Sequence, residues 1–168
     1  MTETALPLKF ATIGAYGFTE PAFFAALERA NVKVFCDIRW RRGVRGSEYS
    51  FVNSARLQHR LEEMGINYFH FRELAPDPAL RLRQAKADKR DGIAKRKRAT
   101  LGEAFSEGYQ TQCLGVFDSR KFIEQFVAVS GTVAFFCVER EPAACHRSLL
   151  AARLRQDLGI EFEHLLPG

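Results

Sequence analysis

The sequence lacks the long apolar run that a membrane-spanning helix needs. No stretch of about 18 consecutive apolar residues occurs anywhere in the chain. The N-terminus, from Met1 to Ala5, has neither a basic flank nor an apolar stretch, so we expect no signal peptide. Both absences predict a cytoplasmic protein with no membrane partner.

Cysteine is scarce as well, with four residues among 168. Small secreted domains that depend on disulfides carry a higher share of cysteine, so we expect these four side chains to be reduced thiols. No internal repeat and no low-complexity linker interrupts the chain. The length suits one domain with a substantial buried core, and we predict a single domain over residues 1–168.

Positive charge is concentrated in one segment. Residues 81–98 contain nine lysines and arginines against two aspartates, whereas the whole chain carries only +5. Clustered positive charge attracts polyphosphates, which favours a nucleic-acid or nucleotide partner. A solvated helix face is the alternative explanation. Because Pro76 and Pro78 accompany weak periodicity here, we predict a basic insertion over residues 72–98, mostly loop with at most one helix.

Short apolar segments alternate with helical patterns along the chain. The predicted strands cover residues 9–14, 32–38, 66–71, 132–138 and 160–166. The predicted helices between them cover residues 19–31, 53–64, 98–109, 118–128 and 141–159, with Phe122, Ile123, Phe126 and Val127 directed inward. The continuous apolar run 132–138 is typical of a central strand covered on both faces. This pattern predicts an α/β fold with a mainly parallel five-stranded sheet, flanked by helices on both faces.

Reactive side chains follow the ends of the predicted strands, where ligands bind in open α/β sheets. Asp37 and Arg39 lie at the end of the second strand, and Glu139 follows the apolar run 132–138. Pro142 near the first helical position places Cys145 about one turn into the last predicted helix. There the helix dipole and the neighbouring His146 and Arg147 favour a thiolate. A small buried structural cysteine is the alternative.

The order of these segments resembles the domain-of-unknown-function family 488. The resemblance spans residues 9–165, and its most distinctive part is the C-x-E-x-x-P-x-x-C-H-R motif from Cys137 to Arg147. Its other parts are Thr12-Ile13-Gly14, Val34-Phe35-Cys36-Asp37-Ile38-Arg39 and Gly65-Ile66-Asn67-Tyr68. The resemblance implies a compact α/β domain and adds weight to Asp37, Arg39, Glu139, Cys145, His146 and Arg147. It implies no activity.

The chain departs from the family's pattern at two places. The usual T-I-G-H-S opening is Thr12-Ile13-Gly14-Ala15-Tyr16 here, so the polar histidine is missing. The usual L-G-G after the third strand is Leu74-Ala75-Pro76. A role that depends on that histidine or on that glycine turn is therefore not expected in this chain.

Other cysteine chemistries fit the sequence less well. Cys-His-Arg also occurs in DNA alkyltransferases, but there a proline precedes the cysteine, where this chain has Ala144. Cys36 and Arg42 have the spacing of cysteine phosphatases, but the bulky Trp40 lies in a loop that would need glycines. Cys137 with Cys145 and His146 would suit zinc, yet no C-x2-C pair supports such a site. We expect Cys137 in the core, and we predict no metal and no cofactor.

The remaining residues divide into catalytic and anchoring groups. We predict catalytic roles for Glu139, Cys145, His146 and Asp37, with an acid as general base and the thiol and imidazole as nucleophile or acid. We predict phosphate binding by Arg39, Arg147, Arg42 and Arg45, and Trp40 beside them suits base stacking. Structural ion pairs at the strand ends are the alternative.

These groups favour an enzyme or binding protein that acts on a phosphate-bearing substrate, with nucleic acid or a nucleotide preferred. Two other functions stay open. One is a non-catalytic nucleic-acid-binding accessory domain, for which the basic segment alone would suffice. The other is a thiol redox or metal-sensing protein, which would depend on the cysteines.

Overall fold

Five strands form one sheet in this computed structural model, which describes residues 7–94 and 97–168. The strands are β1 (Lys9–Ile13), β2 (Val32–Asp37), β3 (Asn67–His70), β4 (Thr132–Phe136) and β5 (Phe162–Leu165). Their order across the sheet is β3-β2-β4-β1-β5, and every neighbouring pair is parallel. The predicted five-stranded, mainly parallel α/β fold is confirmed.

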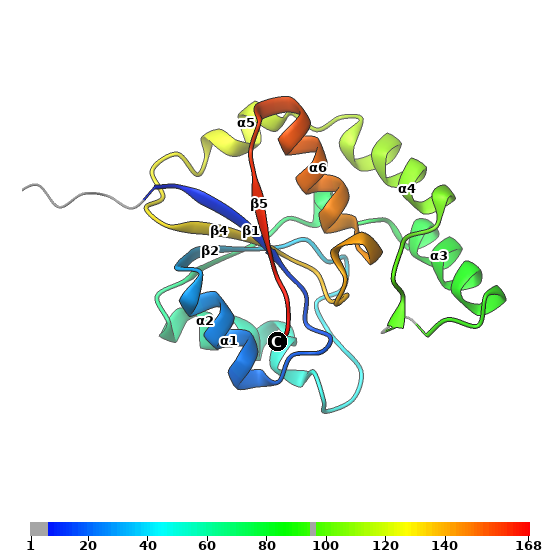
Figure 1. Cartoon of the computed structure of the whole chain (residues 1–168), viewed down its shortest axis with the longest axis horizontal. Helices are drawn as coiled ribbons and strands as arrows, with labels where there is room; N and C mark the ends of the chain where they lie inside the picture. Colours follow the sequence, from blue (N-terminus) through cyan, green and yellow to red (C-terminus); the bar gives the residue numbers. More distant parts are fainter. Residues whose placement is uncertain (1–6, 95–96) are drawn as a thin grey trace, which may run out of the picture.

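Helices cover both faces of the sheet, as predicted (Figure 1). On one face lie α1 (Glu20–Arg29) and α2 (Ser54–Glu63), and on the other lie α5 (Ser119–Glu124) and α6 (His146–Leu158). The crossovers from β1 to β2 and from β2 to β3 step toward one edge of the sheet, whereas the crossover from β4 to β5 steps toward the other. Because parallel crossovers are right-handed, opposite steps place their helices on opposite faces.

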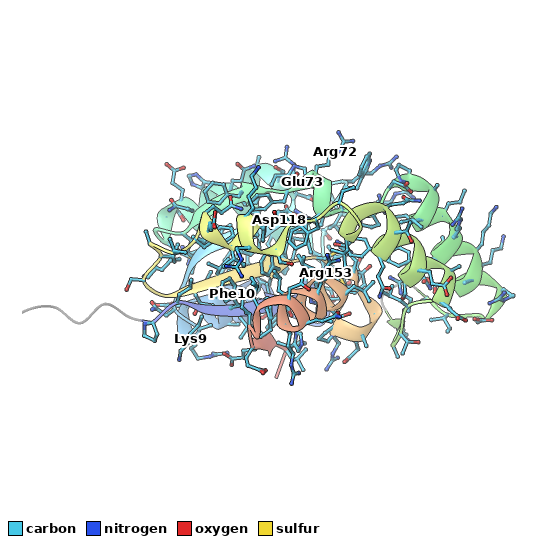
Figure 2. The ribbon with its side chains drawn as sticks, turned by 90° about the horizontal axis from the view of Figure 1, so that it is seen from above. Lys9, Phe10, Arg72, Glu73, Asp118 and Arg153 are labelled. Atoms are coloured by element: carbon cyan, nitrogen blue, oxygen red, sulfur yellow. The ribbon has the colours of Figure 1, made fainter. Side chains whose placement is uncertain are left out.

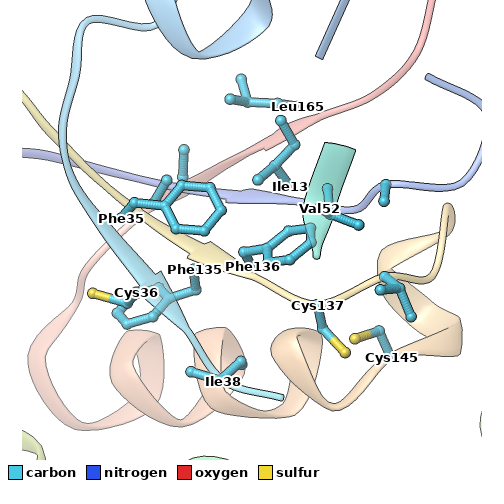
Figure 3. Packing of buried hydrophobic residues seen from close by; sticks show 14 of the residues in the cluster. Ile13, Phe35, Cys36, Ile38, Val52, Phe135, Phe136, Cys137, Cys145 and Leu165 are labelled. Carbon is cyan, nitrogen blue, oxygen red and sulfur yellow. The ribbon is translucent and has the colours of Figure 1, made fainter. Parts of the chain in front are cut away.

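β4 is the central strand, and all five of its residues are buried. Phe136 packs against Phe23 of α1 and Phe35 of β2, with ring centroids 5.7 and 5.1 Å away. Phe135 points to the opposite face and lies 5.9 Å from the ring of Phe122 in α5. Figure 3 shows Phe35, Phe135 and Phe136 around the strand. Burial of such a side chain contributes about 1.5–3 kcal/mol, so β4 anchors the core on both faces.

Two predicted helix ends are confirmed, because each has a local cap. The Thr19 hydroxyl accepts a hydrogen bond from the backbone N–H of Ala22 (3.3 Å) at the start of α1, where Pro21 occupies the first turn. Gly159 ends α6 in the left-handed conformation, with φ at 69°. In the described part of the chain, every helix is too short or too polar to traverse a bilayer.

The predicted basic insertion contains a helix, α3 (Pro78–Arg90), and so has less loop than expected. Asp77 caps it by accepting from the N–H of Leu80 at 2.8 Å, and Pro78 begins it. The buried face of α3 consists of Leu80, Gln84 and Asp88. Because two of these three side chains are polar, the helix has no apolar periodicity that a sequence could reveal.

Two helix boundaries differ as well. α4 (Glu103–Tyr109) begins later than the predicted Arg98, and a π-helical turn over Gln110–Leu114 extends it. α5 ends at Glu124, before Val127, whose side chain is 70% exposed. The prediction that Val127 points inward is wrong, because the helical register that would turn it toward the core stops first.

Arg153 fastens α6 to the segment that precedes α5 (Figure 2). Its guanidinium donates to the backbone carbonyls of Leu114 and Phe117, at 2.8 and 3.5 Å. It also pairs with Asp157 one turn along the helix, at 2.7 Å. These bonds hold α6 against the segment before α5, on the same face of the sheet.

Candidate functional site

A cavity of about 480 Å³ opens at the carboxyl edge of the sheet. The segments after β2 and β4 line it, together with α3, residues of the segment leading into α4, and the start of α6. This is where the topology of a parallel sheet is expected to hold a ligand, and the volume suits a small molecule or one nucleotide unit. Glu139, Cys145, His146, Arg39 and Arg45 of the predicted site all line it.

Cys145 occupies the N-cap position of α6 and is almost fully buried. Its Sγ accepts from the backbone N–H of Arg147 at 3.5 Å, as a serine or aspartate oxygen does in an ordinary cap. The prediction that Cys145 lies one turn inside the helix is wrong, because Pro142–Ala144 form a separate 3-10 turn. The correction places the sulfur closer to the positive end of the helix dipole.

The surroundings of Cys145 favour the anionic form of its thiol. Burial works to raise the pKa of Cys145, but a hydrogen bond from Cys137 and the positive charges of His146 and Arg147 hold it well below the usual thiol value. Burial likewise works to lower the pKa of His146, and the neighbouring Cys145 raises it overall. Each side chain therefore favours the charged form of the other.

The hydrogen bonds of His146 define which ring nitrogen faces Cys145. Its Nε2 lies 2.7 Å from the carbonyl oxygen of Ile38, and a carbonyl only accepts, so Nε2 carries a proton. Nδ1 lies 3.8 Å from the Sγ of Cys145. The ring also packs at a tilt against Tyr109, with centroids 5.3 Å apart. The imidazole is thereby fixed with Nδ1 toward the sulfur.

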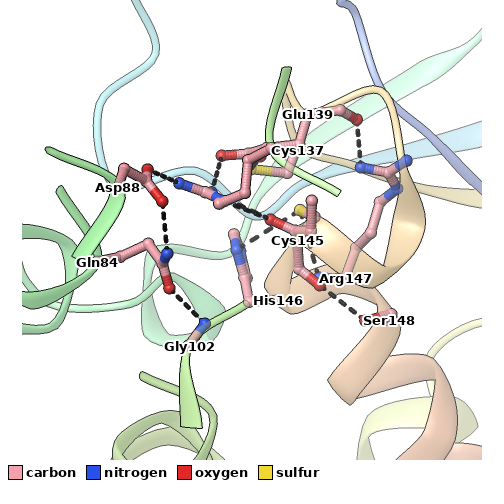
Figure 4. Close-up of polar contacts among 11 residues, drawn as sticks. Gln84, Asp88, Gly102, Cys137, Glu139, Cys145, His146, Arg147 and Ser148 are labelled. Atoms are coloured by element: carbon pink, nitrogen blue, oxygen red, sulfur yellow. Dashed lines mark hydrogen bonds and ion pairs between the residues drawn. The ribbon is translucent and has the colours of Figure 1, made fainter. Parts of the chain in front are cut away.

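Arg98 is a site residue that sequence reasoning missed. Its guanidinium donates to Glu139 at 3.0 Å and to Asp88 at 2.8 Å, and both carboxylates are buried. It also donates to the carbonyl of Ala144 at 3.0 Å, just before the Cys145 cap. Gln84 extends the network by donating to Asp88 at 2.8 Å (Figure 4). The sequence offered one sign of this ion pair, which is the position of Asp88 within the basic segment 81–98.

Asp37 and Arg39 form a buried pair at the end of β2. Two nitrogens of Arg39 bind the two oxygens of Asp37 at 2.9 and 2.8 Å, and Tyr68 donates to Asp37 at 2.6 Å. Asp37 does not line the cavity, so its contacts support an orienting role for Arg39, and its catalytic role stays a prediction. Arg39 also donates to the carbonyl of Val52 at 2.9 Å.

One nitrogen of Arg39 has no bond of its own. Nη1 is buried and has no hydrogen-bond partner among the described residues. The guanidinium lies 4.7 Å from the ring centre of Phe136, which gives it no acceptor on that side. A buried N–H of a charged group that lacks an acceptor costs about 1–3 kcal/mol or more, so this nitrogen calls for an acceptor from a ligand or solvent.

Arg147 is buried behind the cavity rather than within it. Its guanidinium donates to the carbonyls of Glu139 and Arg140 at 2.6 and 3.1 Å, and to the Thr12 hydroxyl at 3.4 Å. These bonds hold the loop after β4 against β1. Its predicted phosphate contact stays a prediction, since the geometry supports a positioning role instead. Arg42 does not line the cavity either.

Cys137 is buried in the core, in agreement with its prediction, but it also reaches the cavity. Its thiol donates to the carboxylate of Glu139 at 3.2 Å. The ligand atoms of Cys137, Cys145 and His146 all lie within 4.8 Å of one another. Among the described residues these are the side chains that could jointly hold a metal ion.

Comparison with protein families gives one match. The family model described as domain of unknown function DUF488 matches residues 21–154. The chain belongs to the DUF488 family. The match runs from α1 into α6, so the DUF488 region contains the whole predicted motif from Cys137 to Arg147. Searches of curated proteins and of solved structures gave no match.

Membership confirms the resemblance inferred from the sequence. The family's description carries no activity, so the function of this DUF488 member has to be argued from its site. β1 and β5 lie outside the matched residues, yet both belong to the same sheet. The matched part contains both Arg39, which follows β2, and Arg98, which lies between α3 and α4, and both line the cavity.

Proposed function

We propose that this protein binds a phosphate-bearing substrate, a nucleotide or the end of a nucleic-acid strand, in the cavity beside Cys145. The observation that carries the proposal is the buried Nη1 of Arg39, which has no partner among the described residues. A phosphate oxygen would supply the missing acceptor through a charge-assisted hydrogen bond. Asp37 holds the guanidinium in place from the other side, so the donor is oriented before the ligand arrives.

The charge of the cavity lining supports an anionic ligand. Five arginines line it, Arg39, Arg41, Arg45, Arg81 and Arg98, against two acids, Asp88 and Glu139. Both acids already pair with Arg98. Arg39 pairs with Asp37, which does not line the cavity. Arg41 and Arg81 therefore add positive charge around the opening, which attracts and orients phosphate.

Trp40 supports a nucleotide in preference to a bare phosphate. Its indole lines the same cavity as Arg39. The guanidinium of Arg72 lies 4.0 Å from the ring centre and steadies the indole from one side. An aromatic side chain beside a group of arginines is the arrangement that single-stranded nucleic-acid sites use to stack a base and hold its phosphate.

Binding of a short single-stranded DNA with a 5′-phosphate, compared with the same strand without it, tests the proposal. We expect tighter binding of the phosphorylated strand at low salt. Arg41→Gln and Arg45→Gln should each weaken binding and reduce the salt slope by about 1, because each variant has one fewer cation to neutralise a phosphate. Arg120→Gln is the matched control, because Arg120 is exposed on α5 and does not line the cavity.

Two results would overturn the proposal. One is equal affinity for the two strands in the wild-type protein. The other is a loss of affinity in Arg120→Gln that matches the loss in Arg41→Gln and Arg45→Gln, since binding would then follow net charge and not this cavity.

A second candidate function is non-catalytic binding of nucleic acid through α3. Lys86, Lys89 and Arg90 are on this helix with side chains at its outer surface, while Gln84 and Asp88 face the protein. Arg98 does not belong to this basic surface as predicted, because buried ion pairs engage it, and Lys95 and Arg96 lie outside the described residues. If Lys86→Gln and Lys89→Gln abolish binding while Arg41→Gln does not, this second function is the correct one.

A further inference from the structure

We propose that Cys137, Cys145 and His146 bind a zinc-class divalent cation, with the carboxylate of Glu139 as the fourth ligand. The four side chains come from two adjoining parts of the chain, the segment after β4 and the start of α6. All four are buried and all four line the same cavity. This inference does not depend on phosphate binding, because the residues that carry it are different.

The spacing of the ligand atoms is the first support. A tetrahedral zinc ion with bonds of about 2.0–2.3 Å places its ligand atoms about 3.3–3.8 Å apart. The Sγ of Cys145 and the Nδ1 of His146 are 3.8 Å apart, and the Sγ of Cys137 is 3.2 Å from a carboxylate oxygen of Glu139. The sulfur and nitrogen atoms all fall within 4.8 Å of one another. Glu139 lies outside this group of three, so its carboxylate has to turn from Cys137 toward the ion to complete the coordination shell.

The direction of the side chains is the second support. In Figure 3 the sulfur atoms of Cys137 and Cys145 point toward each other, while that of Cys36 points elsewhere. Cys137 and Cys145 are separated by the whole loop that contains the 3-10 turn Pro142–Ala144. The loop is held in shape by Arg147, which binds the carbonyls of Glu139 and Arg140. The fold thus directs the thiols of Cys137 and Cys145 toward the same position, where an ion could bind both.

The partners around the ligands are the third support. Metal-binding histidines usually donate their other N–H to a carbonyl or carboxylate, and His146 does so through Nε2 to Ile38 at 2.7 Å. Glu139 is oriented by Arg98, which binds its other oxygen at 3.0 Å. The backbone N–H of Arg147 donates to the Sγ of Cys145 at 3.5 Å. Each of these ligands is therefore held by a neighbour that would stay in place when the ion binds.

The donor set selects the kind of ion. Two thiolates and an imidazole are borderline-soft ligands, which favour zinc over magnesium or calcium. Binding would displace the thiol proton of Cys137 and any proton on Cys145 or on His146 Nδ1 to solvent, with no change of oxidation state. The charge of two thiolates, one carboxylate and a divalent ion would be −1, and the adjacent Arg98 offsets it.

Cobalt(II) provides the most direct test, because it reports tetrahedral thiolate ligation through visible d–d bands and a thiolate-to-cobalt band in the near ultraviolet. We expect the reduced wild-type protein to bind one cobalt ion with both features, and zinc to displace it. Cys137→Ser and Cys145→Ser should each weaken binding at least about 100-fold, beyond the range seen when supporting residues are changed. Cys113→Ser is the matched control, because Cys113 lies outside the cluster.

A second measurement on unaltered protein guards against variants that fail to fold. X-ray absorption of the zinc-loaded wild-type protein should show two sulfur neighbours, with nitrogen and oxygen completing the shell. A first shell without sulfur, no stoichiometric cobalt binding, or unchanged binding in Cys137→Ser and Cys145→Ser would overturn the site. If metal binding fails while the 5′-phosphate preference and its reduction in Arg41→Gln persist, only this inference falls.

Discussion

At the scale of single residues, Arg98 connects more of the site than any residue singled out from the sequence. It joins Asp88 of α3 to Glu139 after β4, and it holds the carbonyl of Ala144 beside the Cys145 cap. Its two ion pairs lie at 2.8 and 3.0 Å and are shielded from solvent. Arg98 therefore fixes the relative positions of the elements that enclose the cavity.

Removal of Arg98 should be strongly destabilising. Arg98→Gln leaves two carboxylates buried without their partner, and breaking a buried pair in this way costs about 3–5 kcal/mol. Urea unfolding of the variant measures the loss. Arg140→Gln is the control, because its pair with Glu141 is about half exposed and contributes only about 0–1 kcal/mol. Adding Glu139→Gln to Arg98→Gln should recover part of the stability, and no recovery would contradict the pairing.

Gly14 is constrained by the same loop. A Cβ at this position would lie 1.9 Å from the carbonyl oxygen of Glu139, which Arg147 already holds. A Cβ is fixed rigidly to the backbone of residue 14, and the atom that it meets is a backbone oxygen, so neither can turn away. Gly14→Ala should therefore cost about 1–3 kcal/mol or more and displace Glu139. Gly43→Ala is the comparison, since its nearest atom would lie 3.9 Å away. Equal urea unfolding midpoints for the two variants would contradict the close contact between residue 14 and the carbonyl of Glu139.

At the scale of elements, the pairing of β1 with β5 should make the free energy of unfolding depend on pH. The Nδ1 of His164 lies 2.6 Å from the Thr12 hydroxyl in the neighbouring strand. Burial and the positive charge of Arg147 lower the pKa of His164 below its usual value. A histidine with a lowered pKa in the folded state takes up its proton more readily in the unfolded state. Its contribution therefore reduces stability as pH falls below about 6.5, the usual histidine value.

His164→Gln isolates this contribution. Above pH 7 the variant and the wild-type protein should differ only by the contribution of the Thr12–His164 hydrogen bond. As pH falls toward about 5, the free energy of unfolding of the wild-type protein should decline relative to that of His164→Gln. Urea unfolding at several pH values checks this, and parallel curves for the two proteins would contradict the lowered pKa.

The elements also show how far a sequence can be interpreted. All five strands were predictable. β1, β2 and β4 are mainly apolar segments, whereas the edge strands β3 and β5 mix aromatic or aliphatic with polar residues. The extent of α3 and its inward face were not predictable, because that face is mainly polar and its partners come from elsewhere in the chain. The Arg98–Glu139 pair links positions 41 residues apart, and no local pattern marks such a contact. The start of α6 was misplaced because a 3-10 turn and a helix share the same proline signal.

At the scale of the whole molecule, the sheet order explains why the site is where it is. β4 and β2 are neighbours although a long stretch of chain separates them, so Arg39 and Glu139 meet at one edge. The crossover from β2 to β3 and the crossover from β4 to β5 run to opposite faces, which leaves a crevice at the carboxyl ends of β2 and β4. α3 and Arg98 then close that crevice into a cavity. The sequence predicted that the strand-end residues lie together, but it did not predict that α3 and Arg98 enclose them.

A crystal structure of the protein with a nucleoside 5′-monophosphate tests the central claim most directly. We expect the phosphate within the cavity, with one oxygen at hydrogen-bonding distance, about 2.7–3.2 Å, from the Nη1 of Arg39. We also expect the Arg39–Asp37 pair to stay intact, since that pair aims the donor. A phosphate bound on the outer face of α3, with Nη1 of Arg39 still without an acceptor from the ligand, would contradict the claim.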